Sequence, residues 1–112
     1  LADNIEYLLI DPYLKRLHSL LKSGDLNSKN IELVEQIVQE VESSRFQDLE
    51  SGDILFIDSS HQSKIGSDVN HIFFDILPRL RSGVLIHIHD ISFPFQYNPK
   101  NFLERSIMVI FI

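Results

Sequence analysis

Short apolar runs alternate with polar, helix-like segments along the whole chain. Four runs are rich in apolar and β-branched residues, which is typical of strands buried in a parallel sheet. We predict strands at residues 5–11 (IEYLLID), 31–38 (IELVEQIV), 53–58 (DILFID) and 84–90 (VLIHIHD). A last apolar run, residues 106–112 (SIMVIFI), is either a final strand or part of a longer element.

A helix is predicted directly after the first strand. Leu14, Leu17 and Leu21 recur at helical spacing. The two residues at the strand end suit a helix start, because Asp11 is a good N-cap and Pro12 is favoured at the first helical position.

The clearest amphipathic pattern lies between the third and fourth predicted strands and indicates a helix there. Pro78 should bend or loosen its last turn. A short segment, residues 43–49, also looks helical, and residues 23–30, 59–68 and 92–101 have loop compositions. The apolar positions of the main helix, spaced i, i+3, i+4, i+7, i+8 and i+11, are Val69, Ile72, Phe73, Ile76, Leu77 and Leu80.

The resulting order is β-α-β-α-β-α-β. Continuous apolar strands that alternate with helices indicate an α/β fold with a mostly parallel sheet and helices on both faces. The 112 residues suffice for one small domain, and we see no repeats or linkers.

Composition narrows the classes of partner. The net charge of −6 and the scattered basic residues argue against nucleic-acid binding, which needs a basic patch. No apolar run approaches the roughly 20 residues of a membrane span, so no membrane partner is expected. The absence of cysteine excludes disulfides and thiolate metal sites and is compatible with the cytoplasmic location that we predict.

Three predicted strands end in an aspartate: Asp11, Asp58 and Asp90. In open α/β sheets, ligands bind beyond the carboxyl ends of the strands, so we expect these residues at one ligand-binding edge. His61 lies three residues after Asp58, and His89 directly precedes Asp90. Carboxylate and imidazole groups placed in this way can share a proton or a metal ion.

Each of these residues also has a structural interpretation. Asp11 can cap a helix, and Asp58 with His61 can form a turn with a surface histidine. His87 lies deeper than His89 on the same strand face, and we interpret it as a hydrogen-bonded core histidine. His18 and His71 fall on helices and read as surface residues.

Residues 52–97, "GDILFIDSSHQSKIGSDVNHIFFDILPRLRSGVLIHIHDISFPFQY", resemble class I S-adenosylmethionine-dependent methyltransferases of the small-molecule branch. "LLIDPY" resembles the second-strand motif whose acidic residue binds the cofactor ribose, which implies this role for Asp11. "VQEV" resembles the adenine-contacting segment, which implies contacts from Gln39 and Glu40. "LFIDSSH" corresponds to the fourth strand and its loop, so Asp58 is expected near the methionine part of the cofactor.

The chain also departs from the family pattern. It contains no G-x-G-x-G turn, and its four glycines are Gly24, Gly52, Gly66 and Gly83. The family sheet has the strand order 3-2-1-4-5 followed by 7-6, so residues 1–112 correspond to a single partial Rossmann-like methyltransferase domain with strands 2 to 5. The central first strand and the last two strands are missing from this correspondence.

Two expectations follow from the missing central strand. The strands at 5–11 and 53–58 must pair with each other or leave apolar edges open. We also expect this chain, a piece of a methyltransferase or a degraded homologue, to bind S-adenosylmethionine weakly and to be weakly active or inactive by itself. Tight binding of the cofactor in a calorimetric titration would contradict that expectation.

The resemblance implies transfer of a methyl group from S-adenosylmethionine to a small-molecule acceptor, for which a hydroxyl is the expected group. His61 or His89 would act as the base, and Asp58 and Asp90 would hold Mg²⁺ if a metal is used. Two other functions fit the same residues: a non-catalytic remnant or interaction module, and a metal-dependent hydrolase. The sequence leaves the acceptor and the oligomeric state open.

Overall fold

The computed structural model describes residues 5–22, 24, 30–91 and 109–111. The chain divides into two units, residues 1–41 and 42–112, and each is described by itself. Both units combine short parallel strands with helices, which confirms the predicted α/β class.

The first unit is one β-α-β segment. Strand β1 (Tyr7–Ile10) pairs in parallel with β2 (Ile31–Val34), and helix α1 (Leu14–Leu20) lies between them in the sequence. The second strand ends at Val34 and is shorter than the predicted 31–38, and the 3₁₀ turn η1 (Val38–Glu40) follows it. Leu14 and Val41 are the buried apolar side chains described in this unit.

Helix α1 begins later than the sequence predicted. Its N-cap is Tyr13 instead of Asp11, and Pro12 precedes the helix. Asp11 Oδ1 accepts a hydrogen bond from the backbone N–H of Tyr13 at 2.6 Å. This Asx-type turn competes with helix formation at the strand end and therefore delays the first helical residue.

The second unit contains a three-stranded sheet in the order β3-β4-β5. Strands β3 (Ile54–Ile57) and β4 (Leu85–Ile88) are parallel, and β5 (Val109–Phe111) is antiparallel to β4. The short helix α3 (Ser44–Gln47) precedes β3, as predicted. The final apolar run thus contributes a strand.

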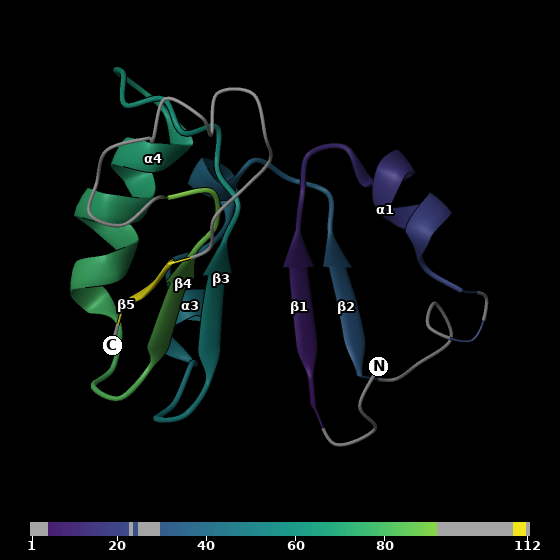
Figure 1. Cartoon of the computed structure of the whole chain (residues 1–112), viewed down its shortest axis with the longest axis horizontal. Helices are drawn as coiled ribbons and strands as arrows, with labels where there is room; N and C mark the ends of the chain where they lie inside the picture. The colour runs from purple at the N-terminus through teal and green to yellow at the C-terminus, as the bar shows by residue number, and fades with distance from the viewer. Residues whose placement is uncertain (1–4, 23, 25–29, 92–108, 112) are drawn as a thin grey trace. The chain divides into compact units, whose positions relative to one another are not determined.

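The connection between β3 and β4 is one helical segment of changing pitch (Figure 1). It consists of α4 (Asp68–His71), the π-turn η2 (Ile72–Ile76) and the 3₁₀ turn η3 (Leu77–Arg79). Pro78 lies in the last turn, as expected. Ile72 and Ile76 are buried, but Phe73 is 41% exposed, so its predicted core position is wrong. The wider π-turn changes the angular spacing of the side chains and takes Phe73 off the buried stripe.

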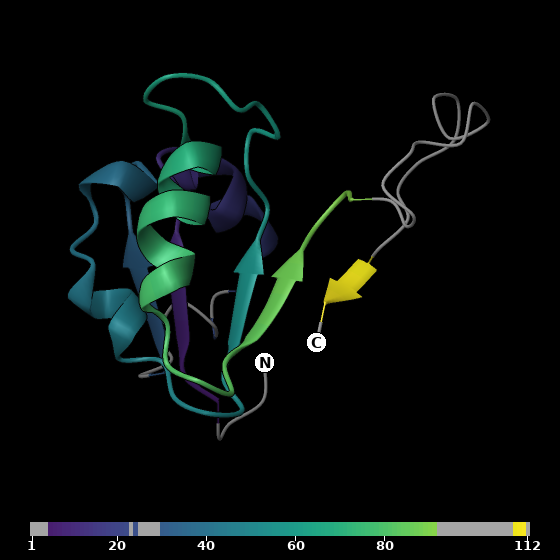
Figure 2. The same ribbon diagram turned by 90° about the vertical axis from the view of Figure 1, so that its left-hand side faces the viewer.

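The two faces of the β3–β4 pair differ in burial. The helical segment covers one face of this pair (Figures 1 and 2). Ile57 and Ile88 are paired across the two strands, and both are buried. Alternate residues point to the opposite face. There Ile54, Phe56 and Leu85 are 63%, 56% and 43% exposed. Burial within the described part of this unit is thus concentrated on one face of the sheet.

The pairing of the described strands shows which strand edges have no partner. Strand β1 pairs with β2, and β3 pairs with β4, in two separate sheets. The strands at the first and third predicted positions therefore do not pair with each other. Each leaves one backbone edge without a described partner strand.

Candidate functional site

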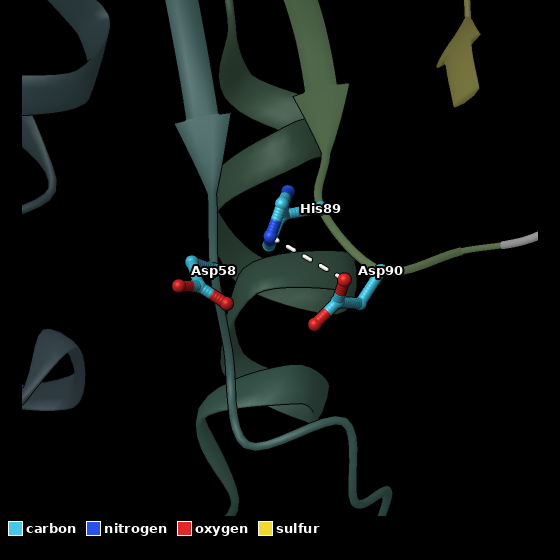
Figure 3. A group of neighbouring side chains, drawn as sticks. All are labelled: Asp58, His89 and Asp90. Atoms are coloured by element: carbon cyan, nitrogen blue, oxygen red, sulfur yellow. Dashed lines mark ion pairs between the residues drawn. The ribbon is translucent and has the colours of Figure 1, made fainter. Parts of the chain in front are cut away.

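The candidate site lies where the chain leaves β3 and β4. The backbone N–H of His89 donates to the carbonyl of Ile57 at 2.8 Å, which extends the parallel ladder one step beyond β4. The residues after both strands are therefore held next to each other. Asp58 follows β3, and His89 and Asp90 follow β4 (Figure 3).

Asp58, His89 and Asp90 form a compact group of potential ligands. One nitrogen or oxygen atom from each residue lies within 4.8 Å of the others, and Figure 3 shows the side chains converging between the two strand ends. His89 Nε2 is 3.4 Å from Asp90 Oδ1. The side chains are 35% and 41% exposed for His89 and Asp90 and 62% for Asp58, so a small molecule or ion can reach them.

Two residues of the site have left-handed backbone conformations. Asp90 and His61 both have φ of 57°. Aspartate tolerates this region because its short polar side chain can interact locally, whereas histidine visits it less often. Such conformations cluster at functional sites, and here they shape the turns that follow both strands.

His61 approaches Asp58 from the loop that follows β3. Its Nε2 lies 3.8 Å from Asp58 Oδ1, and its side chain is 31% exposed. The structure therefore brings together the four residues that the strand-end rule singled out in this unit: Asp58, His61, His89 and Asp90. Their individual roles remain predictions.

Residues 59–67 are held by hydrogen bonds to the start of helix α4. Asp68 accepts hydrogen bonds from the backbone N–H and the hydroxyl of Ser60, at 2.6 and 2.5 Å. Ser67 is the N-cap and accepts from the N–H of Asn70 at 3.2 Å, while Asn70 Oδ1 accepts from the Ser63 hydroxyl at 2.7 Å. These contacts fix the loop that carries His61.

The pKa of Asp68 is affected by these hydrogen bonds. Burial by itself would raise the pKa of Asp68, but hydrogen bonds from the Ser60 hydroxyl, the Ser60 N–H and the Val69 N–H outweigh it and hold the pKa below its ordinary value. Asp68 therefore anchors the loop as a carboxylate. The sequence predicted a loop followed by a helix in this region, but it did not indicate the contact between Asp68 and Ser60, eight residues away.

His87 does not have the predicted environment of a hydrogen-bonded core histidine. It is half-buried, and its buried Nε2 makes no hydrogen bond to the described residues. Its ring instead stacks on Phe56, with ring centroids 4.6 Å apart and planes at 25°. The His89 ring lies 5.7 Å from Phe56 and 6.3 Å from His87. Cross-strand pairing places Phe56 opposite His87, which the sequence alone does not specify.

The residues predicted to bind the ribose and adenine lie in the first unit. Asp11 follows β1, and Gln39 and Glu40 lie in η1 after β2. Because β1 and β2 are parallel, these positions follow the same ends of the two strands. Asp11 and Gln39 are half-buried, and Glu40 is exposed. From the sequence, an apolar wall for the acceptor or packing under the loop is expected of Phe93, Pro94, Phe95 and Tyr97, but these residues lie outside the described part of the structure.

The described fold and site define an α/β protein whose polar residues gather at the carboxyl ends of parallel strands. Residues 2–91 match the model of a methyltransferase-domain family. This match spans most of the chain, and the protein therefore belongs to that methyltransferase family. Comparisons with curated proteins and with solved structures found no match. No helix in the described ranges combines the length and apolar character needed to cross a membrane.

Proposed function

We propose that this protein takes part in methyl transfer from S-adenosylmethionine to a hydroxyl group of a small molecule. The observation that carries the proposal is the convergence of Asp58, His61, His89 and Asp90 at the carboxyl ends of β3 and β4 in a methyltransferase-family chain. In a Rossmann-like arrangement this edge is where ligands bind.

Methyl transfer requires mainly that the protein position the cofactor and the acceptor. The sulfonium of S-adenosylmethionine already activates the methyl carbon, so the protein must align the acceptor oxygen for in-line attack. A hydroxyl acceptor must also lose its proton, and a histidine can accept it near neutral pH. His61 and His89 are the candidate bases at the rim.

The cofactor contacts proposed for the first unit follow the same strand-end logic. Asp11 offers a carboxylate for the ribose hydroxyls, and Gln39 and Glu40 follow the neighbouring strand. One Asp11 oxygen accepts the Tyr13 N–H, and the other accepts no hydrogen bond from the described residues. Without a G-x-G-x-G turn in these 112 residues, backbone contacts to the cofactor are reduced, and we expect weak binding.

A divalent cation fits the donors at the rim. Asp58 and Asp90 offer carboxylate oxygens, and His89 offers its Nε2, which lies 3.4 Å from Asp90 Oδ1. A bound cation would lower the pKa of an acceptor hydroxyl and orient it. The contribution of the chain is to keep the two carboxylates facing each other across adjacent strand ends.

The proposal is tested by single-turnover transfer of an isotope-labelled methyl group at millimolar S-adenosylmethionine, with a panel of small hydroxylated acceptors. We expect slow but enzyme-dependent methylation. His61→Asn should lower the rate about 100-fold, in the range typical of a general base. His18→Asn changes an exposed histidine on α1 and serves as the matched control.

The alternatives predict different results. A metal-dependent hydrolase would turn over ester or phosphoester substrates without S-adenosylmethionine. A non-catalytic module would show no transfer with any acceptor, and Asp58→Ala and His89→Ala would alter nothing but stability. Either outcome would overturn the proposed methyl transfer.

A further inference from the structure

We infer that the outer edge of β3, formed by residues 54–58, is a dimerisation edge: β3 of a second copy of this chain pairs there in antiparallel orientation, about a two-fold axis at Phe56. This assembly is independent of the proposed methyl transfer. It depends on the backbone hydrogen bonds, the exposed side chains and the charges of β3.

The backbone of β3 pairs with β4 through alternate residues. The carbonyls of Asp53 and Ile57 each accept a hydrogen bond at 2.8 Å from N–H groups at the start of β4 and just after it. Because successive residues of a strand direct these groups to opposite sides, Ile54, Phe56 and Asp58 direct theirs to the outer edge. No described strand pairs with β3 on that side. The dimerisation edge thus offers a row of free donors and acceptors.

The side chains of β3 leave this edge unguarded. Edge strands usually carry a charge, a proline or a bulge that prevents pairing with another chain. Strand β3 reads ILFI, and Ile54 and Phe56 are exposed. In the first unit, by contrast, all four residues of β1 are half-buried. Of the described strands, β3 therefore combines an open edge with exposed apolar residues most clearly.

A second copy of β3 is the partner that this edge fits. In a two-fold dimer the same surface pairs with itself, so each donor must meet an acceptor of the same strand. Antiparallel pairing with Phe56 opposite Phe56 of the second copy also places Ile54 opposite Asp58. The outward backbone groups of all three residues are then paired.

Charge selects this register over a shifted one. Sliding the strands so that Asp58 lies opposite Asp58 of the second copy would bring two carboxylates together, which is unfavourable. Pairing about Phe56 keeps the two carboxylates apart and places each one opposite an apolar residue. The only charged residue of the dimerisation edge thus disfavours the competing register.

The Phe56 ring is oriented for a cross-strand contact. It stacks on His87 of its own chain, with ring centroids 4.6 Å apart, and this contact limits its rotation. Pairing about Phe56 brings the two phenylalanine rings together across the axis, and such aromatic pairs stabilise neighbouring strands. The dimer would therefore contain a row of four rings, two from each copy.

Dimerisation would also reach the candidate site. Asp58 lies at the end of the dimerisation edge and belongs to the group with His89 and Asp90. In the dimer, β4 holds one side of this strand end, and Ile54 of the second copy holds the other. Each copy thus contributes a residue next to the site of its partner.

The first test uses the wild-type chain. Sedimentation equilibrium should show a monomer–dimer equilibrium. In a mixture of isotope-labelled and unlabelled chains, filtered NMR spectra should show a contact between the α-protons of Leu55 and Ile57 of different copies, because these residues lie opposite each other in this register. A chain that stays monomeric, or a dimer without this contact, would overturn the inference.

Variants distinguish edge pairing from stacking of the exposed sheet faces. Ile54→Pro removes an outward N–H but no hydrogen bond to β4, so it should weaken dimerisation at least about tenfold while circular dichroism shows a folded chain. Ile54→Val keeps the N–H and is the matched control. Leu85→Lys places a charge on the same exposed face but away from the dimerisation edge, and it should leave the dimer intact.

Loss of the dimer in Leu85→Lys, or equal dimerisation of Ile54→Pro and Ile54→Val, would contradict edge pairing. The α-proton contact is measured in the wild type and therefore decides the question even if Ile54→Pro fails to fold. Because no cofactor or acceptor is present, these results are independent of whether methyl transfer occurs.

Discussion

At the scale of single residues, the candidate site depends on side chains that directly follow strands. The four polar residues at the rim could be predicted from the sequence because the end of an apolar run fixes their place in a parallel sheet. The environments of Ser60, Asp68 and His87 could not. Their contacts depend on the path of a loop and on the register of β3 against β4, which local pattern does not contain.

Asp68→Asn should loosen the loop that carries His61. The variant removes a charged acceptor of two Ser60 hydrogen bonds, and we expect a loss of about 1–2 kcal/mol in the free energy of unfolding at pH 7. Urea unfolding measures the loss. Asp75→Asn, on an exposed ion pair of the same helical segment, is the control and should cost less.

The effect of Asp68→Asn on the free energy of unfolding should depend on pH. Because the pKa of folded Asp68 is lowered, its stabilising contribution is complete above the unfolded pKa and is lost as the pH falls through the folded pKa. The difference in stability between the wild type and Asp68→Asn should therefore shrink below about pH 4. A difference that stays constant into acid would contradict the assigned role of the carboxylate.

At the scale of elements, the strands were predictable and their boundaries were less so. Apolar content identifies β1, β2, β3 and β4, but the pattern predicts longer strands than the structure has. Local hydrogen bonds that compete with regular secondary structure determine where each strand or helix begins and ends. Asp11 shows this most clearly, because its side chain binds the Tyr13 N–H and the helix begins only at Leu14.

Gly83 should be essential to the turn that leads into β4. Its φ is 91°, and a Cβ there would overlap the side chain of Ser51, with a contact of 2.8 Å to the Ser51 Cβ. We expect Gly83→Ala to lower the free energy of unfolding by about 2–3 kcal/mol, from backbone strain and overlap together. Thermal or urea unfolding measures the loss.

Gly52 offers a matched control for this prediction. Its φ is 96°, but nothing lies within 4 Å of a Cβ built there, so Gly52→Ala reports the backbone strain alone. It should cost about 1 kcal/mol, and adding Ser51→Gly should rescue part of the loss in Gly83→Ala. Equal losses for the two glycines would show that the approach of Ser51 is not important.

At the scale of the whole molecule, the chain belongs to a methyltransferase family, and its described strands form two separate sheets. The sequence predicted this choice of pairings only as one of two possibilities. The two possibilities were pairing of the first and third predicted strands or separate pairing with open edges. The choice depends on long-range contacts, which a local sequence pattern does not contain. A separate feature of the β3–β4 pair is its exposed face, on which Ile54, Phe56 and Leu85 are three exposed large apolar residues.

Exposed apolar sheet surface should make the chain associate with itself at high concentration. Ile54→Lys places a charge at the most exposed strand position of this face, and we expect it to reduce association in sedimentation velocity experiments. Ile65→Lys changes a fully exposed loop residue and should have little effect. Association that is equal in the wild type and Ile54→Lys would argue against this surface.

The central claim is that residues at the carboxyl ends of the parallel strands, in each unit by itself, contact S-adenosylmethionine. The most direct measurement is an NMR titration of the ¹⁵N-labelled chain with S-adenosylmethionine up to millimolar concentration, which detects weak binding. We predict saturable shifts at the amides of Asp11 and of the segments 58–61 and 89–90, with little change at Phe74 on the exposed side of the helical segment. An absence of shifts, or shifts confined to residues away from these strand ends, would contradict the account.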